Sequence, residues 1–263
     1  MTASNLPAPS SPMSGARVAR AYLAEWRQET LRVLRTPAFA LPFLALPAPI
    51  YLFFGVVIAG GAVAARPALA SYLFSGWLVF AATMPGLFGV GCGLALERQG
   101  GLLRLKRALP APAGAVILAK MGTAAVLAAL AMALVVAAAA VAGTLPLPGP
   151  RIAAMCLALL AGTVPMSALG LFIGAHASGS AAPAITNLVF LPMLWLSGLF
   201  IPLPAFLEPW VVVWPAFHLN QLALAAAGVH EFRFIPPGIA AAALAGVTVV
   251  FGGLAVRRLA ERG

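Results

Sequence analysis

The stretch IAAMCLALLAGTVPMSALGLFIGAHASGSAAPAITNLVFLPMLWLSGLFIPLPAFL, residues 152–207, decides the fold because it contains no Lys, Arg, Asp or Glu. A helix needs about 20 mostly apolar residues to cross a hydrocarbon layer about 30 Å thick, so this stretch is long enough for two crossings. The segment His176-Ala177-Ser178-Gly179-Ser180 has the composition of a turn. We therefore expect a span at about 152–175 and another at about 182–201.

The rest of the chain is equally apolar. Of its 263 residues, 62% are hydrophobic and 8% are charged, and the mean hydropathy is +1.01. Soluble domains usually carry about 25% charged residues. The two cysteines, Cys92 and Cys156, lie inside apolar runs, where packing is the default role and a disulfide framework is implausible. The composition predicts an all-α integral membrane protein.

Other uncharged runs predict four further spans, which brings the expected total to six. In the first of these runs, Pro42, Pro47 and Pro49 are expected to kink the early turns because proline removes a backbone donor. The third run ends in the turn sequence LPLPGP at 145–150. The four additional spans are predicted at about 38–65, 67–96, 121–145 and 234–256.

Residues 209–230 are also free of formal charge, but we do not expect a seventh span there. Pro215, His218, Asn220 and Gln221 would leave polar groups unsatisfied in hydrocarbon. We expect a re-entrant or interfacial hairpin on the extracytoplasmic side, directly before the last span. Its tryptophans, Trp210 and Trp214, would lie at the level of the lipid headgroups.

The distribution of basic residues supports this topology. Cytoplasmic loops of membrane proteins collect Lys and Arg. With six spans and both termini in the cytoplasm, thirteen of the 16 basic residues are cytoplasmic, and only Arg66, Arg151 and Arg233 are outside. The net charge of +10 is thus explained by topology and not by nucleic acid binding.

Residues 16–258 are expected to form one transmembrane domain between two short tails. Residues 1–15 lack the basic and apolar regions of a cleavable signal peptide and are predicted to be a disordered tail, and 259–263 a cytoplasmic tail. Residues 16–36 have the pattern of an amphipathic helix lying in the membrane interface. The alternative is a basic flank that only fixes orientation. The apolar side of the predicted helix carries Tyr22, Leu23, Trp26, Val33 and Leu34.

The longest cytoplasmic loop, ERQGGLLRLKRALP at 97–110, carries a second helical pattern. Leu102, Leu105 and Leu109 recur at i, i+3 and i+7, so a short helix would show one apolar ridge flanked by basic residues. Such a ridge suits a groove on a partner protein. An interfacial turn held on anionic lipid is the alternative interpretation.

These features together resemble the permease subunits of type-2 ABC exporters over nearly the whole chain. Members of that family have an interfacial helix, six spans, a Glu-x-x-x-Gly-x-x-x-Leu type of loop ending in Leu-Pro, and a hairpin before span six. Residues 187–202, NLVFLPMLWLSGLFIP, resemble the family's fifth span, and residues 214–219, WPAFHL, its hairpin. The loop residues and the following lysine that carry the resemblance are Glu97, Gly101, Leu105, Leu109, Pro110 and Lys120.

The resemblance implies that the loop is a coupling helix that sits on a separately encoded ATPase. Two ATPase copies and a second permease copy or sibling would complete the transporter in the bacterial cytoplasmic (inner) membrane, surrounded by lipid. The sequence contains no Gly-x-x-x-x-Gly-Lys-Ser/Thr phosphate loop. We therefore expect no cofactor on this chain and ATP on the partner. The resemblance assigns the coupling role to Glu97, Gly101, Leu102, Leu105, Lys106, Leu109 and Pro110.

Two other functions are weighed against this one. An ion-coupled transporter usually needs an ionisable residue within its spans, and the predicted spans contain no Asp or Glu. An intramembrane hydrolase would need a nucleophile beside a base, and Ser197 with His218 is the only pairing of interest. Trp195 stands where a nucleophile elbow has glycine. No histidine has a second ligand at metal spacing, so no metal site is expected.

Two groups of span residues have a packing role as their default. Glycines 86, 89, 91 and 93 permit close helix approach. The large side chains of the fifth span would either pack between helices or line a route for an amphiphilic substrate. These are Phe190, Met193, Trp195 and Phe200. The sequence assigns neither a substrate nor the residues that bind it.

Overall fold

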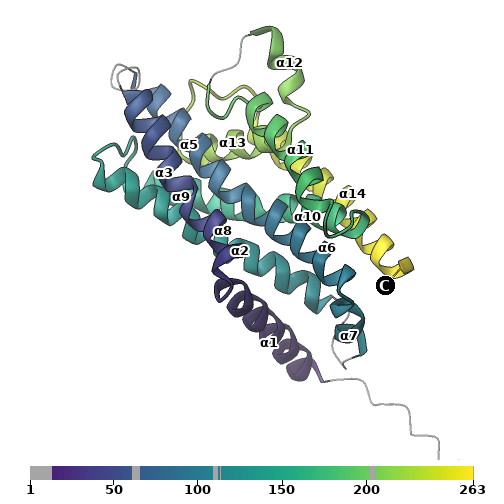
Figure 1. Cartoon of the computed structure of the whole chain (residues 1–263). Coiled ribbons are helices and arrows are strands. Elements are labelled where there is room, and N and C mark those ends of the chain that lie inside the picture. Colours follow the sequence, from purple (N-terminus) through teal and green to yellow (C-terminus); the bar gives the residue numbers. More distant parts are fainter. Residues whose placement is uncertain (1–13, 61–65, 109–111, 113, 202–204, 263) are drawn as a thin grey trace, which may run out of the picture.

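The computed structural model describes residues 14–60, 66–108, 112, 114–201 and 205–262, and all regular elements in that part of the chain are helices. Figure 1 shows them as one elongated helical bundle with α1 at one end and α12 at the other. In chain order the elements are α1 Gly15–Leu34, α2 Pro37–Ala45, α3 Pro47–Ile50, η1 Tyr51–Ile58, α5 Pro67–Met84, η2 Pro85–Val90, α6 Gly91–Gln99, α7 Leu102–Ala108, α8 Ala115–Val141, α9 Gly149–Ala161, α10 Thr163–His176, α11 Ala182–Leu196, η3 Ala205–Leu207, α12 Glu208–Val211, α13 Pro215–Ala226 and α14 Pro237–Arg262.

Five helical stretches in the described residues are long and apolar enough to cross a membrane. Each begins within a few residues of a predicted span. Proline explains the break between α2 and α3, because α2 ends at Ala45, two residues before Pro47, and the chain continues as α3 and then as the π-helical η1. The stretches are Pro37–Ile58, Pro67–Gln99, Ala115–Val141, Gly149–His176 and Pro237–Glu261.

The predicted span at 182–201 corresponds to α11, which is apolar but only 15 residues long. The turn before it lies at the predicted place, since α10 ends at His176 and α11 begins at Ala182. At its other end the helix stops at Leu196, and Gly198 adopts a φ of +69°. Glycine adopts this left-handed conformation readily and therefore ends helices. The count of six spans stays a prediction.

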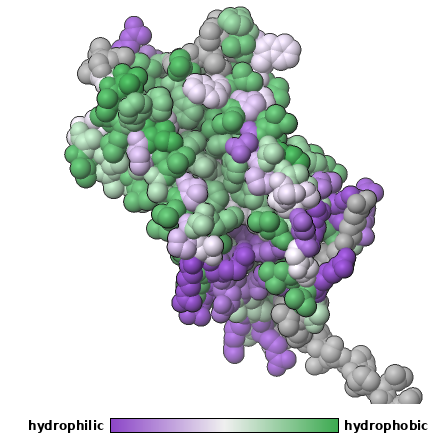
Figure 2. Space-filling view, viewed as in Figure 1, coloured by the Kyte–Doolittle hydropathy of each residue, from purple (hydrophilic) through white to green (hydrophobic). Residues whose placement is uncertain are grey.

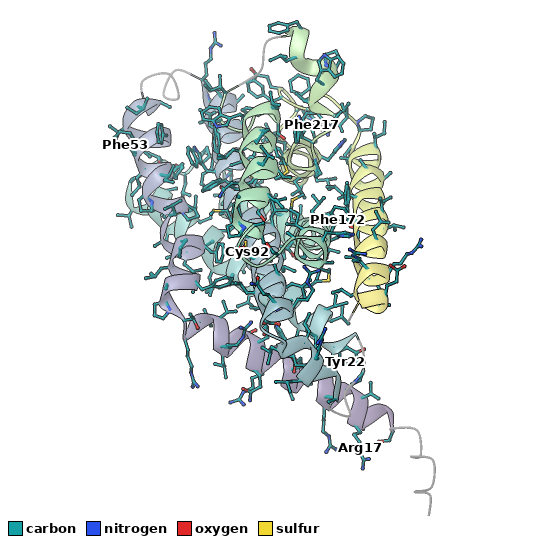
Figure 3. All side chains as sticks on the ribbon, turned by 45° about the vertical axis from the view of Figure 1, so that its right-hand side comes forward. Arg17, Tyr22, Phe53, Cys92, Phe172 and Phe217 are labelled. Atoms are coloured by element: carbon teal, nitrogen blue, oxygen red, sulfur yellow. The ribbon has the colours of Figure 1, made fainter. Side chains whose placement is uncertain are left out.

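The second and fourth of these stretches, Pro67–Gln99 and Gly149–His176, form the centre of the bundle. Pro67–Gln99, which comprises α5, η2 and α6, is mostly buried, whereas only a small part of Pro37–Ile58 and of Pro237–Glu261 is buried. Helix α10 packs against α6, η2 and α14. Figure 3 shows the same arrangement with side chains filling the space between the ribbons.

Glycines permit a close contact between backbones in this centre. A Cβ atom on Gly170 would lie 2.3 Å from the carbonyl oxygen of Gly86, and one on Gly174 would lie 2.6 Å from that of Gly91. The backbones of α10 and the η2–α6 segment therefore approach too closely for any larger residue. Close helix approach is thus seen at Gly86 and Gly91, whereas a Cβ atom on Gly89 or Gly93 would make only ordinary contact with a phenylalanine ring.

The segment before α14 forms the short helices α12 and α13. Its polar side chains face the protein: His218, Asn220 and Gln221 are all buried. Gln221 accepts a hydrogen bond from the backbone N–H of Phe234, and Asn220 accepts one from Ser75. These bonds lower the cost of burying the segment's polar groups, although Asn220 Nδ2 and His218 Nδ1 are buried without a hydrogen-bond partner among the described residues. Placement of this segment as a re-entrant or interfacial hairpin stays a prediction.

Hydrophilic side chains gather at the end of the molecule formed by α1 and α7, and the body beyond it is hydrophobic (Figure 2). We call this the basic end. It includes the described basic residues of α1, α6, α7 and the start of α8. Helix α1 occupies most of the predicted range 16–36, and 259–262 continue α14 as helix. The predicted disordered tail at 1–15 lies almost entirely outside the described residues.

Candidate functional site

Helix α7 exposes a large apolar side chain at the basic end. It begins after Gly100 and Gly101, and Gly101 adopts a φ of +75°, which turns the chain sharply out of α6. Leu103 is buried and packs among α8, α10 and α14 residues, whereas Leu105 is 68% exposed. One face of α7 is therefore fixed to the bundle and the other is free.

Behind α7 lies a group of six charged side chains, which we call the six-charge cluster. It holds three carboxylates and three cations from four helices: Glu25, Glu29 and Arg32 of α1, Glu97 of α6, Lys106 of α7 and Lys120 of α8. Lys120, Glu29 and Glu97 are almost fully buried. The charges balance, which is the condition for burying so many of them.

Lys120 is the centre of this cluster. Its Nζ atom lies 2.7 Å from Glu29 Oε1 and 2.7 Å from Glu97 Oε1. Arg32 joins the same two carboxylates from the more exposed side. Lys106 donates to Glu25 Oε1 over 2.7 Å and lies 3.8 Å from Glu29 Oε2. These bonds connect α7 to α1 and, through Glu29 and Lys120, to α6 and α8.

The sequence places the α1 members on one face of the helix. Glu25, Glu29 and Arg32 are spaced i, i+4 and i+7, so they lie one above another along the side that meets α8. A hydrogen bond of 2.9 Å between Thr30 and Thr123 reinforces this contact. The face of α1 that packs on the protein therefore carries Glu29 to a position opposite Lys120 of α8.

The environment keeps Glu29 ionised. Burial alone would raise the pKa of Glu29, but the charges and hydrogen bonds of Lys120 and Arg32 outweigh burial and lower this pKa from 4.5 to about 2. Glu29 is thus a fixed negative charge near neutral pH, and the cluster stays intact there.

The residues predicted for the coupling loop have different positions. Glu97 and Lys106 point inward to the six-charge cluster, Gly101 forms the turn, Leu102 is half-buried and Leu105 faces outward. The ridge predicted on one face therefore reduces, among the described residues, to Leu105 with partial exposure of Leu102. Leu109 and Pro110 lie outside the described residues.

Glu25, Glu29 and Arg32 were not predicted as site residues. Their spacing on one face of α1, with acidic groups inside a strongly basic segment, was the signal that could have identified them. Lys120 was noted only through the resemblance. Its role as the buried counter-ion depends on contacts across 91 and 23 positions of sequence, which no local pattern contains.

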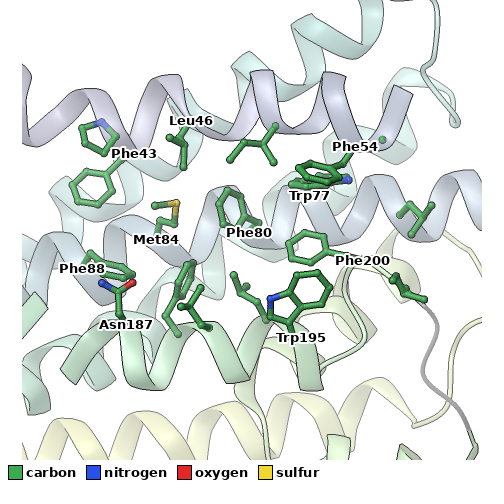
Figure 4. A pocket seen from close by; sticks show the side chains of 18 of the residues that line it. Phe43, Leu46, Phe54, Trp77, Phe80, Met84, Phe88, Asn187, Trp195 and Phe200 are labelled. Carbon is green, nitrogen blue, oxygen red and sulfur yellow. The ribbon is translucent and has the colours of Figure 1, made fainter. Parts of the chain in front are cut away.

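A second candidate site is an apolar groove of about 820 Å³ between the first helical stretch, α5 with η2 and α6, and α11. Aromatic rings form much of its wall (Figure 4), and Trp77 and Phe200 lie 4.5 Å apart between ring centroids. Phe190, Trp195 and Phe200 of the aromatic set proposed from the sequence line it, whereas Met193 is buried elsewhere. Asn187 contributes a polar amide, and its Nδ2 atom donates to the Pro183 carbonyl.

The geometry does not assemble a hydrolase or metal site from the described residues. His218 Nε2 donates to the carbonyl oxygen of Val212 over 2.8 Å, and no hydrogen bond joins His218 to Ser197 there. No three His, Cys, Asp or Glu side chains in that part of the chain are grouped to hold a metal ion.

The fold and its basic end define a class: a multi-pass helical membrane protein with a charged end and an apolar groove. Comparison with protein families matches residues 20–231 to the ABC-2 type transporter family, and the chain belongs to that family. It is therefore a membrane permease of the ABC transporters. No curated protein sequence matches the chain.

Proposed function

We propose that the chain is the membrane-spanning permease of an ATP-driven exporter, and that its basic end is cytoplasmic and docks a separate soluble ATPase. ATP is bound and hydrolysed by the partner. Two permease copies and two ATPase copies form the working transporter, as the family resemblance implies. Both termini of the chain lie in the cytoplasm.

The observation that carries this proposal is the two-faced structure of α7. An apolar side chain that is 68% exposed at a charged, water-facing end has no stabilising role within the chain. The opposite face is held by Leu103 and by the ion pair of Lys106 with Glu25. One face of α7 is held to the bundle, and the other exposes Leu105. Such a helix is suited to bind a partner protein and to transmit the partner's movement to the bundle.

The six-charge cluster supplies the route from α7 into the spans. A force on α7 reaches α1 through Lys106 and reaches α6 and α8 through Glu29, Lys120 and Glu97. Buried charge pairs of this kind resist separation, because each broken pair leaves an uncompensated charge at low dielectric. The four helices therefore respond together to the ATPase.

The apolar groove is proposed as one wall of the translocation pathway, completed by a second permease copy. It is lined by aromatic and aliphatic side chains together with the amide of Asn187. Such a surface accepts apolar or amphiphilic cargo, and its chemistry goes no further towards a particular substrate.

The test is purification of the tagged chain from its own cells in mild detergent, followed by identification of bound proteins. We expect a soluble protein with a phosphate-binding Gly-x-x-x-x-Gly-Lys-Ser/Thr loop, in a complex that hydrolyses ATP. Leu105→Asp should abolish its association without reducing membrane insertion, because a carboxylate would be buried against an apolar partner groove.

The matched control is Val213→Asp, which places the same charge on a side chain that is 68% exposed in the segment between α12 and α13. This variant should keep the ATPase. Equal ATPase recovery with Leu105→Asp and with the parent chain would contradict the assignment of α7.

A further inference from the structure

The six-charge cluster leaves one wall of the groove unconnected. Its members lie on α1, α6, α7 and α8, whereas the groove is closed on one side by α11. Helix α11 packs on α6, η2, α10 and α13, and it begins at a short turn after α10. The cluster holds no residue of α11, so a movement of α7 reaches α11 only through contacts that α6 and its neighbours make outside the cluster.

The last two residues of α6 make that connection. Arg98 donates from Nη2 to the carbonyl oxygen of Ala177 over 2.6 Å, and from Nη1 to that of Ala175. Gln99 Oε1 accepts a hydrogen bond of 2.7 Å from the backbone N–H of Gly179. All three backbone groups belong to the end of α10 or to the turn that starts α11.

These bonds supply partners for backbone groups that are left without a hydrogen bond at the ends of the helices. The last carbonyls of an α-helix have no partner within it, and a cation at this end also interacts favourably with the helix dipole. Arg98 does both at the end of α10, and bonds from a charged donor are stronger than neutral ones. The turn is thus held by α6, and Ser178 continues it by accepting a backbone hydrogen bond from Ala182 through its carbonyl oxygen.

Gly179 shows how close the contact is. A Cβ atom there would lie 2.6 Å from Gln99 Oε1 and 3.0 Å from Leu96 Cδ2. A side chain would therefore displace Gln99 from its hydrogen bond. On the other side of Gln99 only Gly100 and Gly101 separate it from α7.

We infer that Arg98 and Gln99 are positioning residues that couple α7 to α11, so that ATPase docking and ATP binding at the basic end move the α11 wall of the groove. This inference rests on the proposed function. Arg98 and Gln99 are assigned this indirect role because their bonds join them to the backbone of the turn. They act by holding the turn between α10 and α11 to the end of α6.

The experiment measures hydrogen–deuterium exchange of α11 in the permease–ATPase complex in lipid nanodiscs, with and without ATP plus vanadate. In the parent complex, nucleotide trapping should change exchange in α11. In Gln99→Leu and Gly179→Ala the ATPase should still bind and hydrolyse ATP. The nucleotide-dependent change in the exchange of α11 should, however, fall about fivefold or more, which is the factor that a typical coupling free energy produces.

Gln99→Glu is the matched control, because its carboxylate still accepts the Gly179 N–H and should retain the parent response. The double variant Gln99→Leu/Gly179→Ala should reduce the α11 response no further than either single variant, because both substitutions break the same contact between Gln99 and Gly179. An unchanged α11 response in Gln99→Leu and Gly179→Ala, or no α11 response in the parent complex, overturns the inference. Failure of any ATPase to bind the parent chain instead overturns the proposed function, and the inference with it.

Discussion

Lys120 Nζ lies 2.7 Å from Glu97 Oε1 in an almost fully buried contact that joins the start of α8 to the end of α6. Because Glu29 also contacts this ammonium group at 2.7 Å, one lysine is shared by two carboxylates from different helices. Lys120 is also the most buried of the three cations in the cluster, so its loss would leave buried carboxylates with less compensating charge.

Replacement of Lys120 by methionine should destabilise the protein by about 3–5 kcal/mol, the usual cost of leaving a buried charge without its partner. The check is the thermal unfolding midpoint of the purified protein in detergent. Lys120→Met should lower it strongly, since three carboxylates then share two cations.

The double variant Lys120→Met/Glu97→Gln tests the origin of that loss. It restores the balance to two carboxylates and two cations, so it should recover much of the lost stability. A double variant that is less stable than Lys120→Met would show that Lys120 acts by packing and not by charge.

Glu29 should make the stability of the folded protein depend on pH in the acidic range. Its pKa is about 2 in the folded protein and 4.5 ordinarily, so the unfolded state binds the proton more readily. The stabilisation is fully present above pH about 4.5 and is lost as the pH falls towards about 2. The difference in unfolding midpoint between the parent and Glu29→Gln should therefore be largest near neutral pH and shrink through this interval. A constant difference across it would contradict the ionised state assigned to Glu29.

Gly170→Ala should destabilise the bundle by about 1–3 kcal/mol, because the added methyl group overlaps the backbone of η2. The Cβ atom would meet the Gly86 carbonyl oxygen at 2.3 Å. Gly253→Ala in α14 is the control, since nothing lies within 4 Å of its Cβ position. It should be neutral or slightly stabilising in the same thermal assay, as alanine favours helix. Equal effects of the two substitutions would refute the close α10 contact.

The long helices could be predicted because a bilayer imposes a length on uncharged runs, and five of them lie near the expected ranges. The end of α11 could not be predicted from the sequence. It depends on Gly198 and on the backbone of Leu199, whose carbonyl oxygen would lie 1.9 Å from a Cβ atom on Gly76. Sequence distance hides this contact between α5 and the segment after α11. Exclusion of 209–230 from the long spans rested on its polar residues, and their actual partners, such as Ser75, lie far away in sequence.

The candidate site was predictable only in part. Periodicity identified a short helix after Gly101 and placed Leu105 on its outer face, because helix geometry is local. Lys106 was grouped with the outer residues, yet it turns inward because Glu25 lies there, 81 positions away in sequence. Ion pairs between helices follow from the packing of the bundle, and no spacing rule within α7 contains that information.

The most direct test of the account is site-specific photo-crosslinking in living cells, with a photoreactive amino acid at position 105 of the parent chain. Position 106, which faces the six-charge cluster, and position 213, in the exposed segment between α12 and α13, serve as controls. We predict a crosslink from position 105 to a soluble ATPase with a phosphate-binding loop, and no such product from position 213. Crosslinks from position 105 only to lipid or to the chain itself would contradict the central claim that α7 docks an ATPase.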